Sequence, residues 1–268
     1  MTVKHPTRRE ILTLMAGGIA ATAAAATPAL ALARKFEQAA HTPHASRFKA
    51  VAFDAFTIFD PRPIFELVEK FFPGQGTEFG RVWRNKQFDY AWLHLMEGDY
   101  KDFWTITQDA LTYSANMLKV ELTQEKRDAL LAACLNLKPW PDVPGPLAQL
   151  KAKGVRLAFL SNFTPMMIES NIKSSGLEGV FEQVICTEAA HTYKPAPQAY
   201  QMAMDTLKLP REQILFAPFA GWDTAGAKHF GYTTLWVNRL GLPVDELGDM
   251  PDAVGTTLSD VVRFVAKS

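Results

Sequence analysis

The second half of the chain alternates between short apolar runs and amphipathic segments, and this alternation narrows the possible folds more than any other feature. Apolar runs bounded by polar residues indicate buried strands, and amphipathic segments indicate helices. Such alternation predicts an α/β fold, a parallel sheet with helices on both faces. The predicted segments are a helix at Pro146–Lys153, a strand at Val155–Leu160, a helix after Pro165, a strand at Gln183–Thr187, a helix at Gln198–Leu207, a strand at Ile214–Ala217, a helix after Asp223 and a strand at Thr233–Val237.

A further apolar run near the start of this fold ends on a carboxylate. The segment Lys49–Asp60 reads KAVAFDAFTIFD, and its predicted strand ends at Asp54. Because open α/β sheets carry their reactive groups at the carboxyl ends of the strands, Asp54 is a candidate nucleophile. Phe56, two residues later, has no proton to donate. This absence favours a reaction whose leaving group needs no protonation, such as the release of a halide.

The segment that follows this strand does not alternate. Residues 62–142 are predicted to be helical throughout, with Phe88, Trp92 and Leu95 spaced along one helix face. We expect these helices to form a cap over the carboxyl edge of the sheet. The predicted organisation is a signal peptide at 1–33, a linker at 34–47, a Rossmann-like core at 48–61 and 143–268, and a cap at 62–142.

The first 33 residues resemble an export signal. Arg8 and Arg9 precede an uncharged, Ala-rich stretch that ends at Ala33. This pattern is typical of a twin-arginine signal peptide with cleavage after Ala33. The alternative, a chance Arg pair before a buried helix, is disfavoured because Pro28 and two Gly residues interrupt the stretch. We therefore expect the twin-arginine export machinery as a partner and a periplasmic location.

Charge and cysteine content exclude several classes of protein. The 268 residues contain 28 basic and 28 acidic side chains, so nothing suggests nucleic acid as a partner. Cys134 and Cys186 are too few for a disulfide framework and are predicted to be core residues.

Polar residues follow the predicted strands at the points where they end. Ser161 and Asn162 follow one strand, Lys194 follows the next, and Asp223 lies shortly after a third. Each alone has an ordinary structural explanation, such as a turn cap, a solvated charge or a helix N-cap. Together, on consecutive strands of a parallel sheet, they are expected to meet Asp54 at one edge.

These motifs resemble those of the haloacid dehalogenase superfamily, and in particular the type II 2-haloacid dehalogenases. The resemblance runs from about residue 48 to the C-terminus. The matching segments are FDAFTIFD for the nucleophile, VWRNKQFDYAWL in the cap, LAFLSNFTPMMI for the Ser motif, YKPAPQAY for the Lys motif and GWDTAGAKHFGYTTLWVNRLG for the acidic motif.

The resemblance implies catalytic roles for three residues. Asp54 attacks the carbon that bears the halogen and forms an aspartyl ester, Lys194 balances the charge of that carboxylate, and Asp223 activates the hydrolytic water.

The resemblance also implies a substrate-binding set. Ser161 and the backbone amide of Asn162 bind the substrate carboxylate, and Arg84, the Asn162 side chain and Trp222 receive the halide. Tyr200 lends a hydroxyl to the pocket. Thr57 is placed in this set as well, although its loop lacks the Gly that the family carries before this Thr and so is one residue shorter. For Arg84 the structural alternative is a solvated helix charge, and for Trp222 and Tyr200 it is core packing.

Two further comparisons with the family bear on the chemistry. Phosphoryl-transferring relatives bind Mg²⁺ through carboxylates, whereas Phe56 and the Gly221-Trp222 pair leave too few oxygens, so neither a metal nor a cofactor is expected. The family also supplies a Ser and an Asn to the hydrolytic water, at positions that correspond to Pro218 and Ala220. Ester hydrolysis is therefore the step that this sequence supports least.

Three functions remain open from the sequence. The first is a metal-independent hydrolase of short 2-haloalkanoic acids that yields a 2-hydroxy acid and halide. The second is a hydrolase of the same fold with another substrate, such as a phosphate ester. The third is a catalytically weak protein that binds small carboxylates. The resemblance also implies a homodimer through cap and core helices, with Trp104 and Tyr113 as candidate interface residues and core packing as the alternative for both. Substrate chain length, halogen range and stereochemical preference are not determined by the sequence.

Overall fold

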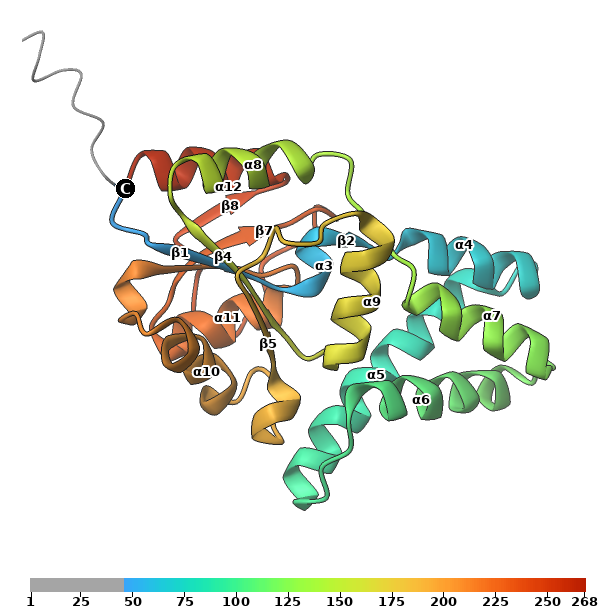
Figure 1. Cartoon of the computed structure of the whole chain (residues 1–268). Coiled ribbons are helices and arrows are strands. Elements are labelled where there is room, and N and C mark those ends of the chain that lie inside the picture. The colour runs from blue at the N-terminus through green and yellow to red at the C-terminus, as the bar shows by residue number, and fades with distance from the viewer. Residues whose placement is uncertain (1–45) are drawn as a thin grey trace, which may run out of the picture. The chain divides into compact units, whose positions relative to one another are not determined.

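Six parallel strands form one sheet in the part of the chain that this computed structural model describes, residues 46–268 (Figure 1). Their order is β5-β4-β1-β6-β7-β8, so β1 is central and the chain adds strands first on one side of it and then on the other. The predicted parallel α/β fold is confirmed. The strands are β1 (Ala50–Phe53), β4 (Arg156–Ser161), β5 (Gln183–Cys186), β6 (Ile214–Ala217), β7 (Thr233–Val237) and β8 (Ala253–Gly255).

Side chains on β1 alternate between two apolar layers. Val51 and Phe53 join the larger cluster, whereas Ala50 and Ala52 join a second one, and all four are fully buried. In Figure 1, α8 and α12 cover one face of the sheet, and α10 and α11 cover the other. Burial on both faces explains why β1 reads as a continuous apolar run. The helices of the two faces are α8 (Pro144–Ala152), α9 (Pro165–Ser175), α10 (Pro197–Leu207), α11 (Gly221–Phe230) and α12 (Leu258–Ala266).

A helical segment is inserted between two very short strands. The strands β2 (Phe59–Asp60) and β3 (Lys138–Pro139) pair in antiparallel register where the insertion leaves the sheet and returns to it. The prediction that residues 62–142 are helical throughout was wrong at β3, because two residues with no side-chain periodicity give no strand signal. The inserted helices are α4 (Arg62–Phe71), α5 (Gly76–Glu97), α6 (Phe103–Leu118) and α7 (Gln124–Cys134).

The face of α5 that the sequence predicted to be apolar packs against the sheet domain. Phe88 and Trp92 both contact Trp222 of α11, and their ring centroids lie 5.2 and 5.4 Å, respectively, from the Trp222 centroid. The Trp92 indole also donates a hydrogen bond to the Lys194 carbonyl oxygen, at 3.1 Å. This face therefore places the inserted helices over the residues that follow β5 and β6.

Most predicted boundaries lie within two residues of the observed ones. Asp223 was expected before a helix but lies in the first turn of α11. The strand β8 and helix α12 were not predicted. The two cysteines are buried and free, as expected. The predicted signal peptide and most of the predicted linker lie outside the described residues. Within residues 46–268, no helix has the length and apolar character needed to cross a membrane.

Candidate active site

The reversal of strand order around β1 creates the site. Parallel neighbours β4 and β6 flank β1, and in sheets of this kind a crevice opens at the carboxyl ends of the strands where the order reverses. Asp54 directly follows β1, and Ser161 is the last residue of β4. Lys194 lies in the segment after β5, and Asp223 lies in the segment after β6. The structure therefore brings the predicted polar set to one edge of the sheet.

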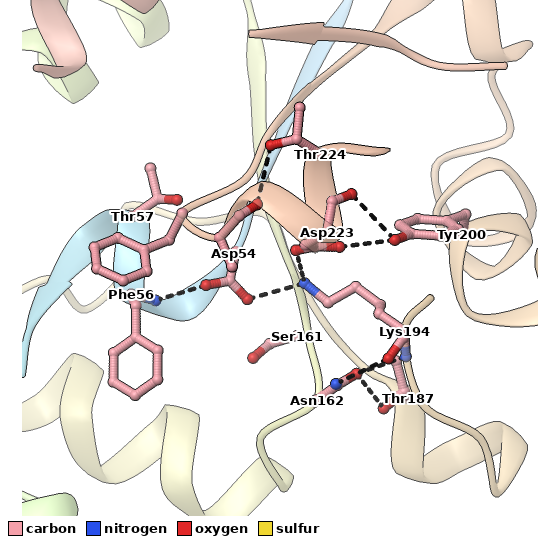
Figure 2. A network of polar contacts seen from close by, with 12 residues as sticks. Asp54, Phe56, Thr57, Ser161, Asn162, Thr187, Lys194, Tyr200, Asp223 and Thr224 are labelled. Carbon is pink, nitrogen blue, oxygen red and sulfur yellow. Dashed lines mark hydrogen bonds and ion pairs between the residues drawn. The ribbon is translucent and has the colours of Figure 1, made fainter. Parts of the chain in front are cut away.

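Asp54 is held through both of its carboxylate oxygens. Oδ2 accepts a hydrogen bond from the Phe56 backbone N–H at 3.0 Å, which caps the single-turn helix α3 (Ala55–Ile58). Oδ1 accepts from Lys194 Nζ at 2.9 Å (Figure 2). The Asp54 side chain is 16 % exposed, whereas those of Lys194 and Asp223 are each 1 % exposed. Of the two carboxylates that contact Lys194, Asp54 is thus the one that a ligand can reach.

Lys194 lies between two carboxylates in the protein interior. Its ammonium contacts Asp223 Oδ2 at 2.6 Å as well as Asp54. Burial lowers the pKa of Lys194, but the attraction of Asp223 and Asp54 outweighs burial and leaves this pKa above its ordinary value. The ammonium is therefore charged and holds the two carboxylates together.

Asp223 has the properties of a base that works near neutral pH. Burial raises its pKa, the Lys194 ammonium lowers it, and the negative charge of Asp54 raises it again, so that the pKa is about 6. Its place in the first turn of α11 puts the carboxylate near the positive end of the helix dipole. Asp223 is therefore largely ionised at pH 7 and retains substantial basicity.

Tyr200 does not line the pocket as the resemblance implied. It is fully buried, and its hydroxyl donates to Asp223 Oδ1 at 2.8 Å (Figure 2). A Cβ at Gly226 of α11 would lie 2.7 Å from this hydroxyl and 2.5 Å from Pro195 Cβ, so only glycine permits this approach. Tyr200 therefore positions Asp223 instead of contacting the ligand.

Ser161 and Asn162 lie at the end of β4 beside the ion pair. The Ser161 hydroxyl accepts from the Phe163 N–H at 3.1 Å. The Asn162 side-chain oxygen accepts from the Lys194 N–H at 2.9 Å and from the Thr187 hydroxyl at 3.3 Å. Both residues line the small cavity next to Asp54. The Asn162 side chain thus also fixes the loop that carries Lys194.

Arg84 is the cation that faces the cavity without a carboxylate partner. It projects from α5, and no ion pair or hydrogen bond joins its guanidinium to any of residues 46–268. Burial lowers the pKa of Arg84, and the Asp54 charge partly offsets this effect. Trp222 and Phe88 line the same cavity. The Arg84 guanidinium lies over the Phe88 ring, 5.7 Å from its centroid. A desolvated guanidinium without a carboxylate partner is a suitable receptor for an anion.

Thr57 is directed away from the cavity. Its side chain is fully buried, and its hydroxyl donates to the Ala217 carbonyl oxygen of β6 at 2.9 Å. The prediction that Thr57 binds substrate is therefore not supported by its position. The shorter loop explains this, because α3 starts immediately after Asp54 and turns Thr57 toward the sheet.

The loop before α11 supplies no polar side chain to Asp223. Pro218 offers a carbonyl oxygen to Val237, and Ala220 is the N-cap of α11 without a side-chain hydrogen bond. The Phe219 ring lies between them and lines the cavity. The groups that orient Asp223 are therefore Lys194 and Tyr200.

The sequence indicated Phe56, Phe219 and Trp222 as an apolar part of the site, and all three line the cavity. It did not indicate Phe163, which packs with Phe219 around Phe56, with ring centroids 5.1 and 5.9 Å from that of Phe56. The position of Phe163, two residues after the last residue of β4, was the available signal. No group of three or more His, Cys, Asp or Glu side chains among residues 46–268 is arranged to hold a metal ion.

Comparison with known proteins agrees with this geometry. Residues 13–231 match the family model described as haloacid dehalogenase-like hydrolase. Haloacetate dehalogenase H-2 of Moraxella sp. (strain B) is 39% identical over 82% of this chain and 99% of its own length. The (S)-2-haloacid dehalogenase of Pseudomonas sp. (strain YL) is 37% identical over 81% of this chain and 94% of its own length. The structure of L-2-haloacid dehalogenase from Xanthobacter autotrophicus with chloropropionic acid covalently bound is 31% identical, covers 81% of this chain and 98% of that one, and has a TM-score of 0.75. The chain therefore belongs to the haloacid dehalogenase-like hydrolase family.

Proposed function

We propose that the protein is a hydrolase that removes the halogen from 2-haloalkanoic acids through an ester with Asp54. The observation that carries the proposal is the buried Lys194 ammonium, which contacts Asp54 at 2.9 Å and Asp223 at 2.6 Å beside a cavity that Arg84 lines. This set holds a nucleophile, a base and an anion receptor. The relatives named above, two of them haloacid dehalogenases and one a haloacetate dehalogenase, support the same reaction.

The first half-reaction is a displacement at C2. A carboxylate oxygen of Asp54 attacks C2 from the side opposite the halogen, and the carbon–oxygen bond forms as the carbon–halogen bond breaks. The halide leaves with the bonding electron pair, and the Arg84 guanidinium receives it. Because displacement inverts C2, an (S)-2-haloacid gives an (R)-2-hydroxy acid.

The second half-reaction hydrolyses the ester. Asp223 takes a proton from water as the water oxygen bonds to Cγ of Asp54. The bond then breaks between Cγ and the former Asp54 oxygen that is bonded to C2. The departing alkoxide takes the proton from Asp223, and the other water proton goes to solvent as Asp54 returns to a carboxylate. Lys194 Nζ and the Phe56 N–H already bond to the two Asp54 oxygens, so they are placed to stabilise the oxyanion.

The substrate carboxylate needs its own anchor. We assign this role to the Ser161 hydroxyl and the Asn162 backbone N–H, which lie at the carboxyl end of β4 beside Asp54. With Asp54 and Asp223 ionised, the positive charges of Lys194 and Arg84 balance them. An incoming carboxylate therefore meets no net negative charge from these four side chains.

Halide release tests the proposal directly. The purified chain from Arg34 onward is given each enantiomer of 2-chloropropionate in the presence of a chelator. Sustained release from the (S) enantiomer is expected. Release of a single equivalent per chain would show that the ester forms but does not hydrolyse, and phosphate release from an aryl phosphate only with added Mg²⁺ would favour a phosphatase.

Ester hydrolysis is expected to depend on the ionisation of Asp223. Its pKa of about 6 applies while Asp54 is negative, and esterification removes that charge. The rate constant for ester decay should therefore fall about tenfold per pH unit below an apparent pKa between 3.8 and about 6. Rapid quenching after one turnover, followed by mass measurement of the Asp54 peptide, gives this rate. A rate independent of pH from 3 to 8 in folded protein would exclude Asp223 as the base.

Tyr200→Phe is expected to slow the same step. The hydroxyl of Tyr200 lowers the pKa of Asp223, so its loss should move the acid limb of ester decay to higher pH and slow decay by roughly tenfold or more. Formation of the ester should change much less, because the hydroxyl does not contact Asp54. Equal slowing of ester formation and decay, without a shift in pH profile, would indicate a packing role alone.

We also propose that residues 1–33 direct export through the twin-arginine pathway and that the protein works in the periplasm. The support is the Arg8-Arg9 pair before an uncharged stretch ending at Ala33. Expression of the full chain in a bacterium should give periplasmic protein that begins at Arg34. Arg8→Lys together with Arg9→Lys should leave it in the cytoplasm.

A homodimer through the inserted helices is a further proposal. Leu93, Met96 and Met117 are exposed on α5 and α6, together with Tyr113, which supports such an interface. Trp104 is instead packed against the core cluster. Light scattering of the purified chain gives the mass in solution, and a monomer at micromolar concentration would exclude a stable dimer.

A further inference from the structure

A second, larger cavity adjoins the one beside Asp54. Its volume is about 240 Å³, and it lies among α4, α5, α7 and α9, between the inserted helices and the sheet domain. Most of its lining is apolar, including Ile64, Trp83, Leu137 and Met167. We refer to it as the apolar chamber. An apolar cavity of about 150 Å³ in another protein is large enough to bind benzene, so the apolar chamber has room for a group of at least that size.

The polar groups at the edge of the apolar chamber are already satisfied, with one exception. Arg62 donates to both oxygens of Asp60, and Gln87 donates to the Thr107 hydroxyl at 2.8 Å. Arg84 lines the apolar chamber without such a partner among residues 46–268. Among residues 46–268, the chamber therefore has one cation without a carboxylate partner, which it shares with the reaction site, and is otherwise suited to an apolar ligand.

The apolar chamber and the reaction cavity share one boundary. Phe56, Arg84, Phe163 and Phe219 line both. The reaction cavity itself has a volume of only about 20 Å³, little more than one water molecule needs. A large substituent on a carbon bonded to Asp54 therefore has to extend past these side chains, and the space beyond them is the apolar chamber.

We infer that the apolar chamber binds an apolar substituent on C2 of the substrate, of the size of a butyl chain or a phenyl ring. The inference rests on the proposed function, because it places C2 at Asp54. It assigns the protein a substrate class, 2-haloacids with large apolar substituents. Burial of such a substituent in the apolar chamber contributes binding free energy that bromoacetate lacks.

Two leucines of the same loop provide a matched pair for the test. Leu240 and Leu242 are 51% and 50% exposed, but only Leu240 lines the apolar chamber. Leu240→Trp narrows the chamber from its rim, and Leu242→Trp makes the same change outside it. Cys134→Phe fills the chamber from α7 on its interior side. Thermal unfolding of each variant establishes that it is folded.

The measurement is kcat/KM for (S)-2-bromohexanoate and for bromoacetate. We expect the wild type to favour 2-bromohexanoate, and the two chamber variants to lower its kcat/KM by about tenfold or more with less than a twofold change for bromoacetate. Leu242→Trp should change neither value. The inference is overturned if the ratio of the two kcat/KM values is unchanged in both chamber variants, or if the wild type turns over bromoacetate but not 2-bromohexanoate.

Failure of the proposed function has a separate signature. If neither acid releases halide, the melting temperature is measured with hexanoate and with acetate, which cannot react. A larger rise with hexanoate in the wild type, absent in Leu240→Trp and Cys134→Phe, still places an apolar chain in the chamber. Equal rises with both acids, or a hexanoate effect that the chamber variants retain, overturn the inference.

Discussion

Asp54→Asn is expected to reduce steady-state halide release at least about a thousandfold, because a neutral amide cannot act as the carboxylate nucleophile. The change preserves the size of the side chain and leaves Lys194 in contact with Asp223 at 2.6 Å. The fold should therefore survive. Halide release from (S)-2-chloropropionate, together with thermal unfolding, measures both effects.

A surface carboxylate supplies the control for this substitution. Asp205 lies exposed on α10, and Asp205→Asn makes the same chemical change away from the site. It should retain activity within about twofold, as expected of surface substitutions. Halide release by Asp54→Asn at the wild-type rate would show that Asp54 is not the nucleophile.

The fate of the water oxygen gives an independent check on Asp54. Because the water attacks Cγ of Asp54, a single turnover in ¹⁸O-enriched water should place the label in the Asp54 carboxylate. The 2-hydroxy acid released in that turnover should carry the original Asp54 oxygen. Label found directly in the product of the first turnover would instead indicate attack of water on C2.

Lys194→Met is expected to cause the largest loss of stability. The ammonium is 1% exposed and separates two carboxylates, so its removal leaves buried like charges without compensation. Breaking a buried ion pair from one side typically costs about 3–5 kcal/mol. The free energy of unfolding, measured in urea at pH 7, should fall by this order, and halide release should be lost.

The pH dependence identifies the cause of this loss. In the variant, Asp223 loses the ammonium that lowers its pKa and keeps the nearby negative charge of Asp54, so the folded-state pKa of Asp223 lies above its unfolded value. The folded variant then binds protons more readily than the unfolded chain, so it gains stability as pH falls through the raised pKa. The difference in the free energy of unfolding between wild type and variant should therefore become smaller as the pH falls from 7 to 4.

Two variants control for the change from lysine to methionine. Lys228, partly exposed, forms an ion pair with Asp252 at 2.8 Å, and Lys228→Met should cost at most about 1 kcal/mol. Adding Asp223→Asn to Lys194→Met removes one of the two repelling charges and should restore part of the stability. A deficit that is constant from pH 4 to 7 and unaffected by Asp223→Asn would show that lost packing, not charge, is responsible.

Sequence reasoning located the polar residues of the site because of a simple property of parallel sheets. Asp54, Ser161, Lys194 and Asp223 all follow predicted strands, and the carboxyl ends of parallel strands share one edge. Their convergence needed no knowledge of how helices pack. The orientation of the Tyr200 side chain could not be predicted in this way. It lies within α10, and whether its hydroxyl met the cavity or Asp223 depended on how closely α11 approached.

The amino-acid sequence by itself determined the parallel sheet, the helical insertion and the order of reactive side chains, because strand and helix periodicities and strand-end positions are local properties of the chain. Only the tertiary structure decided that Thr57 turns toward β6 and that α4, α5, α7 and α9 enclose the apolar chamber. These features depend on side chains from segments that are distant in the sequence. Packing between the inserted helices and the sheet sets the relative positions of those segments, and no local sequence pattern specifies that packing.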